Sequence, residues 1–113
     1  MRYLIVALSL CAAPAQAGQP IYESMAECAG IFQAASEIMQ TEEKRDRVYR
    51  AHLKWAEASA AEAGHDMTPL ITQKAEVWRS KGVTAVFTED FLDWTKYCAS
   101  LAKHKKLVID LYQ

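Results

Sequence analysis

The stretch that decides the fold reads FTEDFLDWTKYCASLAKHKKLVIDLY and covers residues 87–112. Its apolar residues return at intervals of three and four positions, which is the period of one face of an α-helix rather than the alternation of a β-strand. We predict that the longest helix of the chain follows a Thr88 cap and runs to residue 112, and that the rest of the chain packs onto it. Its buried stripe should contain Phe91, Trp94, Cys98, Leu101, Val108 and Leu111.

The first of three earlier helices should follow a capping box. Ser24 and Glu27 have the spacing of that motif, and the apolar positions after them continue to Met39. Gly30 lies inside this helix without a side chain, which allows a neighbouring helix to approach closely. The buried face should contain Met25, Cys28, Phe32 and Ala35.

The second helix should cover residues 42–63, with Thr41 as its N-cap and Gly64 as its C-terminal stop. Two neighbouring stripes of its surface carry apolar residues at helical spacing. We predict that the main apolar face follows Tyr49, Leu53, Ala56, Ala60 and Ala63, with a second flank at Val48, His52, Trp55 and Ser59.

The third helix is short, because Thr68 and Pro69 supply its cap and first residue and Gly82 ends it. Residues 83–87 then have the composition of a strand but no partner strand, so we predict a connector or a short helical turn. The inward face of the third helix should contain Leu70, Ile71, Ala75, Val77 and Trp78.

The N-terminus has the pattern of a secretory signal peptide. Apolar residues 4–13 are followed by small residues at positions 15 and 17, where a signal peptidase reads them. The apolar run is about ten residues long, well short of the ~20 that a transmembrane helix needs. We expect cleavage before Gly18, which leaves one domain (18–113) without a membrane span, in the bacterial periplasm or secreted. A lipoprotein signal acylated at Cys11 is the alternative, which the bulky Leu10 disfavours.

The cysteine count supports an oxidising compartment. Cys11 lies in the predicted leader, so the mature chain keeps Cys28 and Cys98, which should form a disulfide; two buried free thiols are the alternative. Closing a loop of about 70 residues would stabilise the fold by roughly 4 kcal/mol in the chain-entropy account of disulfides. Short turns between four helices give alternating directions, so the first and fourth helices should be antiparallel and adjacent, and the bond requires that adjacency. The predicted fold is therefore all-α: a small irregular four-helix bundle with one disulfide.

The charge of the chain is nearly balanced. It has 13 Lys and Arg residues against 14 Asp and Glu residues, and the loss of Arg2 with the leader leaves twelve against fourteen, a net charge of −2. Such a total favours neither nucleic acid nor an anionic membrane as a partner. Basic clusters at residues 44–50 and 103–106 should be solvated helix faces, with docking of an acidic partner as the alternative.

No pattern in the sequence specifies a reaction. The chain contains no c-type haem attachment motif, Gly-rich phosphate loop, nucleophile elbow or His-Glu-x-x-His helix. Glu62, His65 and Asp66 come nearest to a metal-ligand set, but the polarity expected of a turn beside Gly64 explains them. We therefore expect a protein that is not an enzyme and holds no metal or cofactor; a small envelope enzyme is an alternative.

Met25 and His104 support the sharpest ligand hypothesis. Met25 lies one turn before Cys28, and His104 lies between one and two turns after Cys98, so in an antiparallel pair both displacements point the same way. A Met and a His from the outer helices of an exported bundle resemble, in outline, the site at which soluble b-type cytochromes hold non-covalent haem. This resemblance implies a haem- or metal-binding bundle as an alternative function.

The favoured hypothesis is an interaction protein of the bacterial envelope. Small size, a signal peptide, an all-helical fold and one long-range disulfide resemble the architecture of acid-stress chaperones and of the immunity proteins that block cell-wall amidases. The partner should bind an exposed loop, for which His65, Asp66 and Met67 are candidates, with Phe87 on the next exposed connector. The sequence identifies neither the partner nor the oligomeric state.

Overall fold

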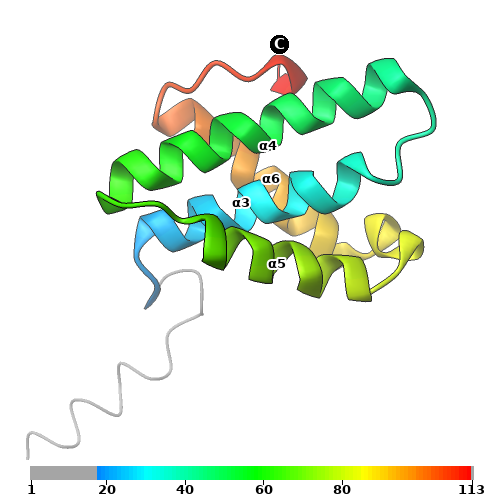
Figure 1. Ribbon diagram of the computed structural model, residues 1–113, viewed down its shortest axis with the longest axis horizontal. Coiled ribbons are helices and arrows are strands. Elements are labelled where there is room, and N and C mark those ends of the chain that lie inside the picture. The colour runs from blue at the N-terminus through cyan, green and yellow to red at the C-terminus, as the bar shows by residue number, and fades with distance from the viewer. Residues whose placement is uncertain (1–17, 113) are drawn as a thin grey trace, which may run out of the picture.

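The computed structural model describes residues 18–112, and the regular secondary structure of this part of the chain is all helical, without β-strands (Figure 1). The predicted all-α class is confirmed. The predicted signal peptide, residues 1–17, lies outside the described residues. The α-helices are α3 (Ile21–Ser36), α4 (Glu42–Ala63), α5 (Thr68–Ser80) and α6 (Glu89–His104), and the 3-10 helices are η1 (Val83–Phe87) and η2 (Asp110–Tyr112).

Helix α3 lies at the centre of the fold, with α4 along one side, α5 along another and α6 crossing behind (Figure 1). Eleven of its 16 residues are buried, whereas α6 buries three of its 16. The prediction that the last helix is the packing centre is therefore wrong. The reason is that α3 carries small or apolar side chains on every side, including Ala26 and Ala29, whereas α6 has a single narrow apolar stripe.

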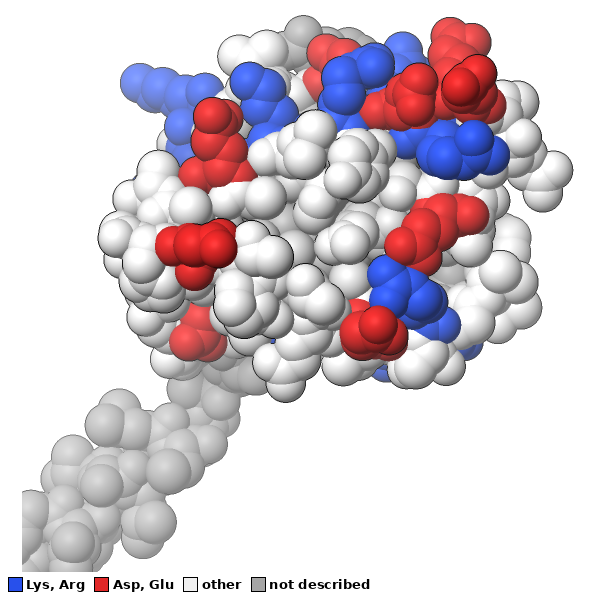
Figure 2. Space-filling view, in the orientation of Figure 1, with Lys and Arg blue, Asp and Glu red and all other residues white. Residues whose placement is uncertain are grey.

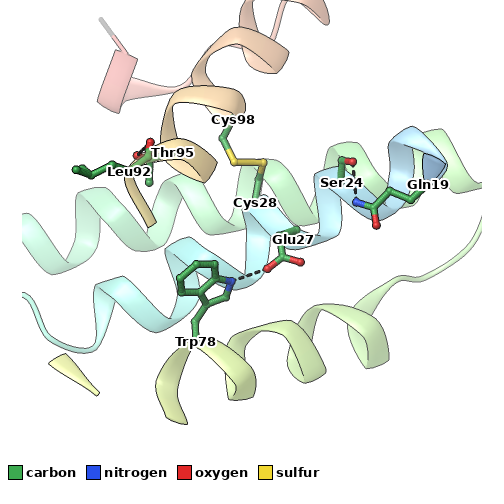
Figure 3. Close-up of a disulfide and its surroundings, with 8 residues drawn as sticks. All are labelled: Gln19, Ser24, Glu27, Cys28, Trp78, Leu92, Thr95 and Cys98. Atoms are coloured by element: carbon green, nitrogen blue, oxygen red, sulfur yellow. Dashed lines mark hydrogen bonds between the residues drawn. A yellow bond between two sulfur atoms is a disulfide. The ribbon is translucent and has the colours of Figure 1, made fainter. Parts of the chain in front are cut away.

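The predicted capping box at the start of the first helix is also wrong, because α3 begins at Ile21, before Ser24. Pro20 is the N-cap, and Ser24 and Glu27 are buried within the helix. Gln19 Nε2 donates to Ser24 Oγ at 2.9 Å, and the Glu27 carboxylate faces α5 (Figure 3). The spacing of a capping box also places two polar side chains one turn apart on a helix face, and here that face is covered by neighbours.

Gly30 allows the close approach of α5 that the sequence predicts. A Cβ atom added there would lie 2.7 Å from Lys74 Cβ and 2.9 Å from the backbone nitrogen of Ala75. These distances are shorter than van der Waals contact, so no other residue fits without moving α5. The small residue sets the distance between the two helices.

Helix α4 begins and ends as predicted. The Thr41 hydroxyl accepts the Lys44 N–H at 3.2 Å, which satisfies one of the donors left open in the first turn. Gly64 adopts a left-handed φ of 84°, and its N–H donates to the Ala60 carbonyl oxygen at 2.8 Å.

The buried face of α4 is the second flank rather than the predicted main face. Tyr49 and Leu53 are 44% and 49% exposed, whereas Trp55 is fully buried. His52 Nδ1 donates to the Ala29 carbonyl oxygen of α3 at 2.9 Å. Both stripes have helical spacing, so periodicity alone does not decide which one is buried. Trp55 is the largest side chain on either stripe, and its burial removes the most apolar area from water. Trp55 therefore determines which face of α4 points to the core.

The length of the third helix and the connector match their predictions, but the predicted Thr68 cap is wrong: Met67 is the N-cap, and Thr68 is the first residue of the helix. Helix α5 has 13 residues, with Ile71, Ala75 and Trp78 buried; Val77, expected to face inward, is 49% exposed. The connector is the short helical turn η1. Thr88 then caps α6 by accepting a backbone N–H of its first turn.

Helix α6 ends at His104, so the prediction of a helix to residue 112 is wrong. Lys106 adopts a left-handed φ of 59°, its N–H donates to the carbonyl of Lys103 at 3.2 Å, and the next N–H donates to that of Ala102 at 2.9 Å. This pair of bonds is a Schellman motif. The left-handed position holds lysine instead of the usual glycine, and the sequence therefore carries no visible stop.

The chain after α6 turns back and lies along α4 (Figure 1). Val108, predicted to be buried, is 64% exposed, whereas its neighbour Ile109 is 1% exposed. Tyr112 packs edge-on against Phe32 of α3, with 6.4 Å between the ring centroids. This segment covers part of the core that a continued helix would have left open.

The predicted disulfide between Cys28 and Cys98 is present (Figure 3). Both cysteines are fully buried where α6 crosses α3, and their Cα atoms are 5.9 Å apart. The two helices touch only over a short stretch around this bond. The bundle is irregular for that reason: α6 crosses α3 (Figure 1), and the prediction that these two helices lie antiparallel and side by side is wrong.

Candidate interaction surface

The two segments predicted to bind a partner lie at opposite ends of the molecule (Figure 1). Residues 64–67 join α4 to α5 at one end, and Phe87 ends η1 at the other. Helix α5, about 20 Å long at 1.5 Å per residue, separates them. They are two separate candidate surfaces rather than one.

Two of the residues in the loop at 64–67 make contacts that stabilise the fold. Met67 is 4% exposed and belongs to the core. The Asp66 carboxylate accepts both the N–H and the hydroxyl of Thr68, at 3.0 and 2.7 Å, and these bonds hold the pKa of Asp66 below its usual range. Of the three predicted loop residues, His65 and Asp66 are exposed, and Asp66 binds the first residue of α5.

The two proposed haem ligands differ in exposure. Met25 is 1% exposed within the core, whereas His104 is exposed at the last residue of α6. Neither lines either of the two cavities described below, so haem binding stays a prediction. Within residues 18–112, no three His, Cys, Asp or Glu side chains are grouped to hold a metal ion, and Glu62 pairs with Lys105 at 2.9 Å.

An apolar pocket of about 160 Å³ opens at the η1 end of the molecule. Four elements meet there: the C-terminal ends of α3 and α5, the turn η1, and the first turn of α6 (Figure 1). Helices α3, α5 and η1 each contribute buried core residues to the lining of this pocket. The pocket is therefore formed by the packed helices rather than by loops. Its apolar lining includes Ile31, Ala34, Ile38, Trp78, Val86 and Phe91.

Phe87 stands beside this pocket and is 82% exposed, the highest value among the large apolar side chains of the described chain. Burying such a side chain would contribute about 1.5–3 kcal/mol, so its exposure is a cost that the folded monomer does not relieve. Val83, on the same turn, is 63% exposed. We call the pocket together with Val83, Val86 and Phe87 the η1 surface.

Ion pairs of Arg79 line the edge of the η1 surface that α5 forms. Arg79 donates from Nε and a terminal nitrogen to the two carboxylate oxygens of Glu37, at 2.7 and 2.8 Å, and it also pairs with Glu76 at 3.0 Å. The bonds from Arg79 lower the pKa of Glu37, and the two carboxylates raise the pKa of Arg79. Lys81 lies over the ring of Trp78, 5.2 Å from its centroid. The pocket therefore has an apolar floor and a charged rim.

A buried polar contact holds the Trp78 wall of the pocket in place. The Trp78 indole N–H donates to the Glu27 carboxylate (Figure 3), and Lys74 Nζ lies 3.1 Å from the other carboxylate oxygen. The Trp78 ring also meets Phe91 edge-on at 5.8 Å. Sequence reasoning missed this role for Glu27, although its position one turn before the apolar Ile31 was a signal that it faces the core.

A second, wider groove of about 360 Å³ runs between α4 and the returning C-terminal segment. Leu53 and Val108 supply exposed apolar surface, and Arg50 pairs with Asp110 across the groove at 3.4 Å. Both members of this pair are more than half exposed, so it contributes little to stability. The groove offers less enclosure than the η1 surface and no projecting aromatic side chain.

Charges of both signs lie on the face of the molecule shown in Figure 2. On the face seen in Figure 2, charged side chains of both signs gather along the edge over α4, and the middle of the face is mostly uncharged. Residues 44–47, the start of the predicted basic cluster, are exposed and stand beside the acidic residues Glu42 and Glu43. This mixture is typical of a solvated helix face.

Comparison with models of known protein families, with characterised proteins and with solved structures finds no significant match for this chain. Among the described helices, none combines the length and the apolar character that crossing a bilayer requires. A functional assignment therefore rests on the chain's own residues, and the η1 surface is the feature that its packing leaves unexplained.

Proposed function

We propose that this chain is a small exported helical protein that acts by binding another protein through the η1 surface. The observation that carries the proposal is Phe87, which is 82% exposed beside an apolar pocket. Interfaces of this kind concentrate their binding energy in a few aromatic or arginine side chains, surrounded by contacts that exclude water. The η1 surface has the aromatic side chain, the pocket and a rim with arginine.

Export to the periplasm or the medium is part of the proposal. It is supported by the leader-like residues 1–17 and by a buried disulfide, which is compatible with an oxidising compartment. When a bacterial host expresses the full chain, the envelope fraction should contain the protein, and its intact mass should match a chain that begins at Gly18. Full-length protein retained in the cytosol, with both thiols reactive, would contradict it.

A stoichiometric binder, such as an enzyme inhibitor or an immunity protein, fits the surface better than an acid-activated chaperone. A chaperone of that type would need to loosen as the pH falls, and the Arg79 bonds keep Glu37 charged to a lower pH than usual, so the rim of the pocket resists mild acid. A single projecting side chain beside one pocket is suited to one partner.

The decisive comparison uses two exposed apolar residues on different surfaces. Phe87→Ser removes the aromatic side chain of the η1 surface, and Val108→Ser is the matched control in the α4 groove. The oxidised mature chain should recover a stoichiometric partner from envelope extract, and calorimetry on the isolated pair should show that Phe87→Ser weakens binding by about 2 kcal/mol. Val108→Ser should leave the affinity unchanged. The reverse pattern would move the interface to the α4 groove and overturn the proposal.

A further inference from the structure

We propose that the η1 surface pairs with the same surface of a second copy of this chain, with Phe87 of each copy inserted into the apolar pocket of the other. This inference rests on the proposed function, since it takes the η1 surface to be an interface and names its partner. The side chain that projects and the pocket that can receive one belong to the same surface. A two-fold symmetric dimer uses such a pair twice, because each copy supplies both parts.

The size and lining of the pocket fit a phenyl ring. Its volume is about 160 Å³, and an apolar protein cavity of roughly 150 Å³ is known to hold one benzene molecule. Trp78 and Phe91 are among the lining residues and already meet edge-on at 5.8 Å, so an inserted ring would find aromatic faces and edges in the geometry that aromatic pairs prefer.

Phe87 is held away from its own pocket by the backbone that follows it. Thr88 is extended, with φ −84° and ψ 154°, and its N–H and hydroxyl both donate to the Ala85 carbonyl, at 3.0 and 2.7 Å. The Thr88 hydroxyl also accepts the Phe91 N–H at 3.2 Å. These bonds fix the corner between η1 and α6, and Phe87 is not among the residues that line the pocket. A phenylalanine ring that enters this pocket would therefore come from another molecule.

The charges beside the two parts are complementary. Exposed Glu89 and Asp90 follow Phe87 directly, whereas Lys81 stands over Trp78, which lines the pocket. Arg79 is already paired with Glu37 and Glu76, but among the described residues Lys81 makes no ion pair. Inserting Phe87 brings the acidic pair of one copy toward Lys81 of the other, and symmetry repeats the contact.

The test separates the projecting ring from the pocket with two variants of the oxidised mature chain. Phe87→Ala removes the ring and keeps the pocket, and Ala34→Phe fills the pocket and keeps Phe87. Sedimentation over a concentration series should show a wild-type dimer, and each variant alone should associate at least about a hundred-fold more weakly, because both insertions are lost. Val108→Ala, which alters the α4 groove, should dimerise as the wild type does. Circular dichroism and a melting curve establish that each variant is folded.

Mixing the two variants gives the sharpest outcome. In an equimolar mixture, Phe87 of the Ala34→Phe chain can enter the open pocket of the Phe87→Ala chain, so a heterodimer should form with affinity between that of the wild type and that of either variant. Failure of the folded variants to form it would overturn reciprocal insertion. A wild-type chain that stays monomeric at every concentration would do the same. If that monomer still binds an envelope partner, and loses it on Phe87→Ser, self-pairing is wrong while the proposed function stands.

Discussion

Helices α5 and α6 are both held against α3, but by different means. Helix α5 lies in close contact with α3 at Gly30, and the buried Glu27 carboxylate ties it down through Trp78 and Lys74. Helix α6 touches α3 over a short stretch and is joined to it by the Cys28–Cys98 bond.

The contacts that hold α5 are spread over several residues of α3, whereas α6 is held to α3 mainly at one covalent bond. The η1 surface spans both kinds of attachment, because its pocket is lined by Trp78 of α5 and by Phe91 of α6. The shape of the candidate interface therefore depends on the less extensive of the two attachments. Five changes, ordered from the largest expected effect to the smallest, test this contrast.

Replacing both cysteines, Cys28→Ala with Cys98→Ala, should have the largest effect. Loss of a bond that closes a 70-residue separation should reduce the free energy of unfolding by about 4 kcal/mol. Hydrogen exchange should show that amides of α6 and η1 lose protection first, while those of α3, α4 and α5 keep theirs longer. Equal loss of protection in α5 and α6 would remove the distinction between the two attachments.

Gly30→Ala should disturb the α5 attachment. The added Cβ would lie 2.7 Å from Lys74 Cβ and 2.9 Å from a backbone nitrogen, so α5 must move outward, at a cost of about 2 kcal/mol in urea denaturation. Gly18→Ala is the matched control, because a Cβ atom there meets nothing within 4 Å. Equal stability of the two variants would show that α5 adjusts freely.

Glu27→Gln keeps the shape of the side chain but removes its charge. The loss weakens the bonds from Trp78 and Lys74 and should reduce the free energy of unfolding by about 1.5 kcal/mol. Trp78 fluorescence should shift, since the indole loses a charged acceptor. Glu76→Gln, at the exposed Arg79 pair, should change stability by less than about 0.5 kcal/mol. Comparable effects at the two sites would show that burial of Glu27 contributes nothing.

Lys106→Gly should stabilise the end of α6. Lysine pays a steric cost at the left-handed φ of 59° that glycine avoids, so the variant should gain about 0.7 kcal/mol, measured as a higher midpoint of denaturation. Lys103→Gly, inside α6, is the control and should destabilise. A destabilised Lys106→Gly would show that the lysine side chain makes a contact worth more than the strain.

Protonation of Glu37 in acid should have the smallest effect on the free energy of unfolding. Its ion pair with Arg79 links the ends of α3 and α5. The hydrogen bonds from Arg79 lower the pKa of Glu37 from its ordinary value of 4.5. The stabilisation is therefore present above the unfolded-state pKa and is lost as the pH falls through the folded-state pKa. The side chain is 46% exposed, so solvent screening limits the effect to about 0.5 kcal/mol. Melting temperatures of wild type and Glu37→Gln should converge in acid, and a constant gap would contradict this account.

The sequence predicted those parts of the fold that have local signals. Thr41 and Gly64 mark the ends of α4, Thr88 marks the start of α6, and the two remaining cysteines identify the disulfide. Each of these features depends on the chemistry of one or two residues and their immediate neighbours. The end of α6 has no such signal, because its left-handed position holds Lys106 instead of glycine.

The centre of the fold and the candidate interface could not be read in the same way, because both depend on contacts between distant residues. The central role of α3 follows from small side chains on all its sides, which periodicity alone does not reveal. Phe87 was a predicted candidate because it lies on a connector, but the pocket beside it needs Ile31, Trp78 and Phe91 from three different helices. Met67 was wrongly expected to be exposed, because its burial depends on tertiary contacts.

The central position of α3 has a consequence for the order in which the molecule is made. Among the described helices α3 is synthesised first, and its small and apolar side chains on every side are shielded only as α4 and α5 follow. Cys98 follows all three of these helices in the chain, so the disulfide can form only after α3, α4 and α5 have been synthesised. Until then the nascent α3 is the segment most in need of protection from premature aggregation.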